Sequence, residues 1–199
     1  MKHLVQKQLA QSIATMQAVL ADEKISDTLV TIAELTAKAM RSGHKLLVAG
    51  NGGSAADAQH LVAEFVVRLT DTRPALRAIA LTTDSSILTA CANDFGFDQI
   101  FARQIEALGQ PGDLFLGIST SGNSANIVNA LEQARKSQIT TIGFTGAGGG
   151  KMRSLCDHLI AIPSTVTMNI QESHLALEHI FCMLVECFYF NTTNPLTSK

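Results

Sequence analysis

The sequence predicts an α/β protein built on a parallel β-sheet with helices covering both faces. Five short apolar runs follow one another after residue 43, each ends in small or polar residues, and helical patterns separate most of them. Strands buried on both faces of a parallel sheet have this continuous apolar character, and alternating strands and helices build such sheets. The runs span residues 45–50, 76–82, 113–119, 139–146 and 158–163.

The first part of the chain, residues 1–43, is predicted to form helices. Apolar residues recur there at steps of three and four, which is the period of a helix with one buried face. The segment ADEKISD (21–27) interrupts the pattern, and Gly43 is a typical helix stop. We therefore expect two N-terminal helices ahead of the first strand.

A last long helix is expected over residues 169–190, followed by a frayed tail over 191–199. The α/β core and the last helix together occupy residues 44–190, and no linker, repeat or low-complexity stretch divides them. A chain of 199 residues is long enough for one well-packed core. We expect a single domain over 1–199.

The composition is that of an ordinary globular protein, and it argues against several functions. Net charge is −2 with no basic block, and Trp is absent, which disfavours a nucleic-acid surface. The four cysteines lack C-x-x-C spacing and fit the reduced thiols of a cytosolic protein. The N-terminus lacks the pattern of a signal peptide, and no apolar run approaches a membrane span. We expect a cytoplasmic protein that binds neither nucleic acid nor a membrane.

Two predicted strands end in loops whose chemistry suits a phosphate group. The first loop is Gly50-Asn51-Gly52-Gly53-Ser54, and the second is the hydroxyl-rich stretch 119–124. In a parallel sheet, ligands bind at the carboxyl ends of strands, where glycine permits close approach and a helix N-terminus offers free N–H groups. The alternative is a structural role, in which the hydroxyls only cap the next helix. Four hydroxyls exceed what one cap needs, and we prefer the phosphate interpretation. A third glycine-rich turn, 145–152, is expected to be structural.

Two predicted helices carry polar pairs on largely apolar faces. His60 and Glu64 are four residues apart, and Gln171 and His179 are eight apart, within roughly 80° around a helix. These groups suit either zinc ligation or general acid–base chemistry by Glu64 and His179. On spacing alone, the pair His174 and Glu178 is equally good, so the residues do not choose between His174 and His179.

The remaining histidines, His3, His44 and His158, we assign to structural roles.

Together, four segments of the chain resemble the sugar-isomerase (SIS) domain family. They are AGNGGSAADAQHLVAEF, ANDFGFDQIFARQ, GDLFLGISTSGNSANIVNAL and IQESHLALEHI, in this order, and the likeness runs from about Met1 to Phe190. The resemblance implies a flavodoxin-like five-stranded parallel sheet and a homotetramer. It also implies an aldose–ketose isomerase that converts sedoheptulose 7-phosphate to D-glycero-D-manno-heptose 7-phosphate, the first step toward the heptose of the lipopolysaccharide core.

The resemblance also assigns roles to residues of this chain. It favours His179 over His174 and makes Glu64 and His179 the acid–base pair. It implies one zinc ion per subunit, held by His60, Glu64, Gln171 and His179. The substrate-binding residues that it implies are Asn51, Gly52, Gly53, Ser54, Arg68, Asp94, Ser119, Thr120, Ser121, Ser124 and Gln171.

One departure from the family pattern precedes the last of these segments. Many members carry an arginine there, often after an acidic residue, whereas this chain has Met168 and Asn169.

Two other functions occur on this fold and are weighed against the isomerase. One is a non-enzymatic SIS protein that binds a replication-initiator partner and lacks the full acid–base and metal set. The other is a sugar-phosphate sensor, which usually carries an added DNA-binding domain. Because His60, Glu64, Gln171 and His179 are all present, the sequence favours the enzyme.

Overall fold

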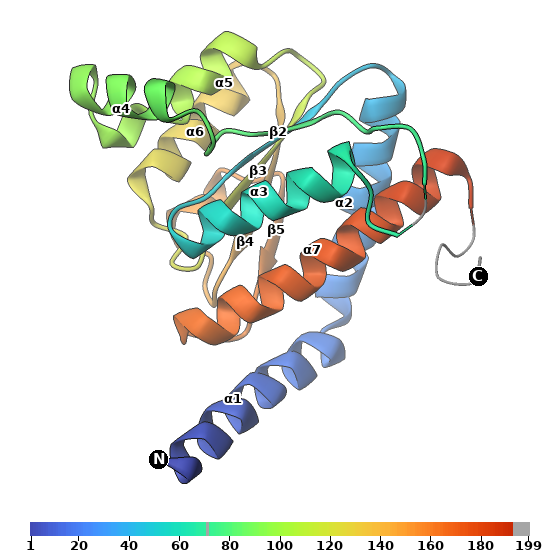
Figure 1. Cartoon of the computed structure of the whole chain (residues 1–199), viewed down its shortest axis with the longest axis vertical. Helices are drawn as coiled ribbons and strands as arrows, with labels where there is room; N and C mark the ends of the chain where they lie inside the picture. The colour runs from blue at the N-terminus through green and yellow to red at the C-terminus, as the bar shows by residue number, and fades with distance from the viewer. Residues whose placement is uncertain (71, 193–199) are drawn as a thin grey trace.

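The computed structural model, which describes residues 1–70 and 72–192, contains the predicted parallel sheet (Figure 1). Its five strands lie in the order β2-β1-β3-β4-β5, and every neighbouring pair is parallel. Each strand falls within one of the five apolar runs: β1 Leu46–Ala49, β2 Ala78–Ala80, β3 Leu114–Ser119, β4 Thr140–Thr145 and β5 His158–Ala161. The predicted fold class is therefore confirmed.

Helices cover both faces of the sheet because alternate strand residues point to opposite sides. The helices are α1 Lys2–Ala21, α2 Glu23–Arg41, α3 Gly53–Val66, α4 Ser85–Asp94, α5 Ala102–Leu108, α6 Ala125–Lys136 and α7 Thr167–Phe190, with short 3₁₀ turns at Phe97–Gln99 and Gly150–Ser154. Leu46 and Val48 of β1 belong to the core under α2, α3 and α7, whereas Leu47 and Ala49 belong to the core under α4, α5 and α6.

The strand order places the two predicted ligand loops side by side. The chain runs from β1 outward to β2, and then returns to the other side of β1 for β3, so the order reverses between β1 and β3. A crevice forms at such a switch point, outside the carboxyl ends of the strands. The loops after β1 and after β3 both leave the sheet at this point.

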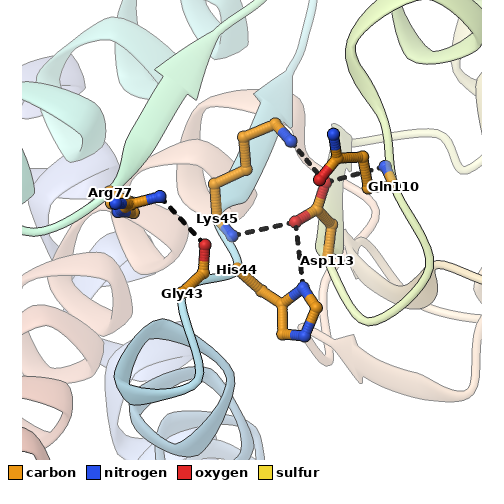
Figure 2. A network of polar contacts seen from close by, with 6 residues as sticks. All are labelled: Gly43, His44, Lys45, Arg77, Gln110 and Asp113. Atoms are coloured by element: carbon orange, nitrogen blue, oxygen red, sulfur yellow. Dashed lines mark hydrogen bonds and ion pairs between the residues drawn. The ribbon is translucent and has the colours of Figure 1, made fainter.

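A buried charge network fixes the amino ends of β1 and β3 (Figure 2). The Asp113 side chain is 1% exposed and accepts hydrogen bonds from Lys45 Nζ at 2.6 Å, the Lys45 backbone N–H at 2.9 Å and the Gln110 N–H at 2.9 Å. His44 Nδ1 lies 3.7 Å from the same carboxylate, in agreement with the structural role predicted for this histidine. The network secures the two strands at the end opposite the ligand loops, and their pairing continues to Ala49 and Gly117 at the loop end.

The N-terminal helices break where the sequence predicts, at Asp22 between α1 and α2. Figure 1 shows α1 projecting from the body of the molecule, next to α7. Gln8 of α1 donates to Asn169 at 2.8 Å, and Asn169 donates to Thr15 at 3.4 Å. Asn169 is 2% exposed. Asn169, one of the two residues at which the chain departs from the family pattern, therefore connects α7 to α1.

Helix α7 begins two residues before its predicted start and is the longest helix of the described residues. Contrary to the expectation that no apolar run approaches a membrane span, α7 alone among the described helices has the length and apolar composition of one. It packs against α1, α2 and α3, and its buried face carries His174, Glu178 and Glu186. These features are those of a core helix.

Two further predictions concern the tail and the cysteines. The frayed tail predicted over 191–199 lies outside the described residues from 193 onward. All four cysteines are free, with Cys91 and Cys182 buried and Cys156 and Cys187 half-buried.

Candidate active site

The glycine-rich loop after β1 is shaped by its contact with α7. Gly52 has φ +56° in the left-handed region, where glycine is favoured, and α3 begins at the next residue. A Cβ on Gly53 would overlap the Gln171 amide, and a Cβ on Gly50 would overlap Ser54. At least part of the glycine content is therefore required by close packing within the chain.

The hydroxyl-rich loop after β3 gathers three serine hydroxyls at the start of α6. Ser119 Oγ lies 2.9 Å from Ser124 Oγ and 3.4 Å from Ser121 Oγ. Ser124 is the residue before the first turn of α6, but its side chain makes no capping hydrogen bond. Capping therefore does not account for this hydroxyl, and the cluster faces a helix N-terminus, which attracts anions. Thr120 lies in the same loop and is half-buried.

The third glycine-rich turn supports this hydroxyl loop through backbone hydrogen bonds. The backbone N–H groups of Gly146 and Met152 donate to the carbonyls of Thr120 and Gly122 at 3.0 and 3.1 Å. Gly122 has φ +65°, and a Cβ there would overlap the Gly149 carbonyl. These contacts fit the structural role that the sequence predicted for the turn.

A pair of asparagines joins the two ligand loops. Asn51 donates to Asn126 Oδ1 at 2.9 Å, and Asn126 donates back to Asn51 Oδ1 at 2.8 Å. Asn126, the second residue of α6, is 2% exposed. Asn51 is predicted to bind the sugar, but its side-chain amide also makes the two hydrogen bonds that join the loops. Sequence reasoning missed Asn126, although a polar amide beside a ligand loop was an available signal.

Three of the four predicted metal ligands come together between α3 and α7. His60 Nε2 lies 2.8 Å from His179 Nε2, and Glu64 Oε1 lies 3.6 Å from His60 Nε2. One ligand atom from each of the three residues lies within 4.8 Å of the others. His60 and Glu64 share a face of α3 because they are four residues apart, and the packing of α7 on α3 brings His179 beside them.

Gln171 lies at the same interface, nearer the start of α3. Its Nε2 donates to Asp57 Oδ2 at 3.0 Å. Asp57 is 7% exposed and precedes His60 by three residues, so it lies on the same side of α3. Burial raises the pKa of the Asp57 carboxyl, and the hydrogen bond from Gln171 partly offsets the rise. Sequence reasoning missed Asp57, whose spacing from His60 was the available signal.

Contiguous contacts connect the hydroxyl loop to the metal-ligand cluster. Asn126 of α6 pairs with Asn51, α3 begins two residues later at Gly53, and Gly53 packs on Gln171. Gln171 in turn bonds Asp57, one helical turn before His60. The loops and the cluster thus lie along one continuous set of contacts over the carboxyl end of the sheet.

Two predicted sugar-binding residues are not joined to this set within the described part of the chain. Arg68 lies beyond the end of α3, is exposed, and donates to Thr72 Oγ1 at 2.8 Å. Asp94 is the last residue of α4, is exposed, and accepts from Asn93 at 2.7 Å. None of the described hydrogen bonds or ion pairs connects either residue to the serine cluster or to His60.

His174 and His179, which spacing does not distinguish, lie in different surroundings. His174 is fully buried against Phe144, and its Nε2 lies 3.0 Å from the Thr145 carbonyl oxygen. Burial lowers the pKa of the His174 imidazole to about 4 from an ordinary 6.5. This residue is a neutral core histidine, whereas His179 faces α3.

Glu178, the partner of His174 by spacing, is also part of the interior. It is 1% exposed, and neither carboxyl oxygen has a hydrogen-bond partner among the described residues. Burial, and secondarily the Asp57 carboxylate, raises the pKa of Glu178 to about 8. The side chain is therefore held as a neutral acid at neutral pH, which lowers the cost of burying it.

Comparisons with known proteins identify the family and the fold. A family model described as "SIS domain" matches residues 9–146. The chain is 50% identical over 186 residues to a phosphoheptose isomerase of Aneurinibacillus thermoaerophilus, covering 94% of each chain. It is 53% identical to "Phosphoheptose isomerase 2" of Campylobacter jejuni, covering 89% of this chain and 88% of that protein. The solved structure of a phosphoheptose isomerase from Neisseria gonorrhoeae matches with TM-score 0.86 and 40% identity, covering 94% and 97% of the two chains.

The buried state of His174 predicts a specific dependence of stability on pH. Between pH 6.5 and about 4 the unfolded chain takes up a proton on this imidazole and the folded chain does not. The free energy of unfolding therefore falls as the pH falls, by about 1.4 kcal/mol per pH unit from this group. Urea unfolding should be measured at pH 7 and at pH 5. Between these two values, the free energy of unfolding of wild type should fall by about 2 kcal/mol more than that of His174→Gln. His3→Gln, on the exposed first turn of α1, is the control and should behave as wild type; equal losses in wild type and His174→Gln would contradict the prediction.

Proposed function

Because this chain belongs to the SIS domain family, we propose that it is a phosphoheptose isomerase that converts sedoheptulose 7-phosphate to D-glycero-D-manno-heptose 7-phosphate. The observation that carries the proposal is the meeting of His60, Glu64 and His179 between α3 and α7. The relatives that carry this name are 50% and 53% identical to the chain over most of its length.

The hydroxyl loop is the proposed phosphate site. The clustered hydroxyls of Ser119, Ser121 and Ser124, with Thr120 beside them, provide hydrogen-bond donors to phosphate oxygens. The N-terminus of α6 adds free backbone N–H groups and a partial positive charge. Binding the phosphate at this distance from the reacting carbons orients the sugar and selects which carbons face the base. In the same proposal, the loop Asn51–Ser54, Arg68 and Asp94 contact the sugar.

The acid–base chemistry is assigned to Glu64 and His179. Glu64 removes the proton from C1 of the ketose and returns it to C2, so that an enediol forms and then collapses to the aldose. His179 carries the accompanying proton from the C1 hydroxyl to the C2 oxygen. The two residues come from different helices, and Glu64 Oε1 lies 3.6 Å from His60 Nε2 beside them.

The same cluster is the proposed holder of one zinc ion per subunit. Two imidazole nitrogens and a carboxylate oxygen within 4.8 Å of one another are a donor set that suits zinc. The interface also holds the buried carboxyl group of Asp57, which in its ionised form favours a cation nearby. His60, Glu64 and His179 would hold the ion, with Gln171 as a fourth ligand. When bound, zinc would polarise the substrate carbonyl or keep the site in shape.

We also propose that the enzyme is a homotetramer, most simply with D₂ symmetry. The apolar side chains Leu4, Leu9 and Ile13 of α1 are 58–59% exposed. A groove of about 410 Å³ between α1, α2 and α7 is lined mainly by apolar residues, including Val19 and Leu177. A second copy of the chain is the partner that fits this surface, and it would also cover a substrate that lies open at the end of the sheet.

The alternative, a non-enzymatic SIS protein that binds a replication initiator, has no specific observation in its favour. Such a protein needs no converging imidazoles and carboxylate, and this chain brings His60, Glu64 and His179 together. We place the enzyme in the cytoplasm, as an early step in making the heptose of the lipopolysaccharide core. The four free cysteines are consistent with a reducing compartment.

The isomerase assignment is tested by supplying sedoheptulose 7-phosphate and measuring the aldose product. Wild type should turn it over, and Glu64→Gln should reduce kcat by about a thousandfold or more, because the amide cannot accept the proton. Light scattering should give the mass of four chains for both proteins, which separates loss of the base from loss of assembly. Near-normal activity of Glu64→Gln would remove Glu64 from this role.

The phosphate site is tested by the double variant Ser119→Ala/Ser121→Ala. Loss of two hydrogen bonds to a charged group should raise KM by about tenfold to a hundredfold, with a smaller change in kcat. The matched control is Ser42→Ala/Ser137→Ala, which removes two serine hydroxyls at the C-terminal ends of α2 and α6, ahead of β1 and β4 and so at the edge of the sheet opposite the loop. An unchanged KM in the first variant would mean that the hydroxyls serve the loop alone.

The metal proposal is tested by elemental analysis of protein purified without chelators. We expect about one zinc per chain, strongly reduced occupancy in His60→Ala, and wild-type occupancy in His158→Ala, since loss of one of few ligands weakens binding. Full activity in protein that contains no zinc would contradict the proposal.

A further inference from the structure

Arg73 occupies an unusual position next to the candidate base. It lies in the loop between α3 and β2, and its side chain is 6% exposed. The guanidinium makes five hydrogen bonds, which equals its number of N–H donors. They reach Glu186 Oε1 from Nε at 2.8 Å and from Nη2 at 2.6 Å, the Phe65 carbonyl at 2.7 Å, the Pro74 carbonyl at 3.1 Å and the Glu64 carbonyl at 2.6 Å.

These bonds cap the C-terminal end of α3. The last carbonyls of a helix lack partners within the helix and carry a partial negative charge, so a cation there is favourable. Arg73 satisfies the carbonyls of Glu64 and Phe65, one of which belongs to the proposed base itself. The turn of α3 that presents Glu64 is therefore held by a side chain from outside the helix.

The same guanidinium ties this turn to α7. Glu186 is 5% exposed and follows His179 by seven residues, which places the two on the same side of α7 within roughly 20°. Nearby, Phe65 and Phe181 pack edge to face at 5.7 Å between ring centres. Apolar packing sets the distance between the helices but is not directional. The directed hydrogen bonds of Arg73, two to Glu186 of α7 and two to carbonyls of α3, also restrict rotation and sliding.

We propose that Arg73 and Glu186 are positioning residues, which hold Glu64 in register with His60 and His179 across the α3–α7 interface. The pair touches neither substrate nor metal. It acts by fixing the backbone of Glu64 relative to the helix that carries His179, and a small displacement of a catalytic group is costly to the rate. The part of this inference that concerns turnover rests on the proposed isomerase function.

The test separates positioning from stability with the double variant Arg73→Met/Glu186→Met. Replacing a buried ion pair by apolar side chains of similar volume often leaves stability unchanged. We expect a melting temperature near wild type, a kcat lowered by about tenfold or more, and a KM within about threefold, because the phosphate loop is untouched. The zinc dissociation constant, measured by competition with a chelating dye, should rise about tenfold, because two helices share the ligands.

A second variant keeps the test decisive if the double variant fails to fold. Arg73→Lys retains the charge opposite Glu186 but offers three donors without the planar fork, so it cannot make all five bonds of the guanidinium. We expect it to fold, to lower kcat by about fivefold, and to leave KM near wild type. Wild-type kcat and zinc affinity in either folded variant, to within about twofold, would overturn the proposal.

The matched control is Arg41→Met. Arg41 of α2 also donates to α7, at the Phe188 carbonyl at 3.0 Å, but makes no described bond to α3. It should keep both kcat and zinc affinity. If wild type and Arg41→Met fail to convert sedoheptulose 7-phosphate, the proposed function is wrong, and the zinc measurement then decides the role of Arg73 without reference to turnover.

Discussion

The close approach of α3 to α7 is the constraint on which the candidate site depends. Imidazole nitrogens from the two helices come within 2.8 Å of each other, and neither helix alone presents this arrangement. The approach is possible at the start of α3 because Gly53 has no side chain to collide with Gln171. It is maintained farther along by the packing of Phe65 on Phe181 and by the bonds of Arg73. Displacement of either helix would separate the groups that give the site its chemistry.

This interface contains four carboxyl groups, and each is accommodated in a different way. Asp57 accepts a hydrogen bond from Gln171, and Glu186 is paired with Arg73. Glu178 has no partner among the described residues, and its raised pKa keeps it protonated near neutrality. Glu64 remains; its Oε1 lies 3.6 Å from His60 Nε2, and its side chain makes no hydrogen bond among the described residues. Because the other three are satisfied or neutral, Glu64 is the carboxylate with capacity left for a proton or a metal ion.

The sheet contributes by bringing two loops from distant parts of the sequence to one place. The reversal of strand order between β1 and β3 places their carboxyl ends side by side, and the Asn51–Asn126 pair then joins the loops. The third glycine-rich turn supports the serine cluster through backbone bonds. The charge network around Asp113 secures the same two strands at their other end (Figure 2). Rigid elements thus support the loops on which ligand recognition is proposed.

The sequence by itself determined the elements and their local chemistry. Apolar runs placed all five strands, helical spacing paired His60 with Glu64, and the serines after β3 marked a polar loop, because each of these patterns is set by neighbours within a few residues. Tertiary structure decided the rest. His174 and His179 are five residues apart, so they face directions roughly 140° apart, and only the packing of α7 shows which faces α3. Tertiary structure also decided that Gln171 bonds Asp57 and that Arg73 bonds the Glu64 carbonyl, because the two residues of each pair lie on different elements. Local periodicity fixes which residues share a face, but the face that a helix turns toward its neighbour depends on contacts between residues far apart in the chain.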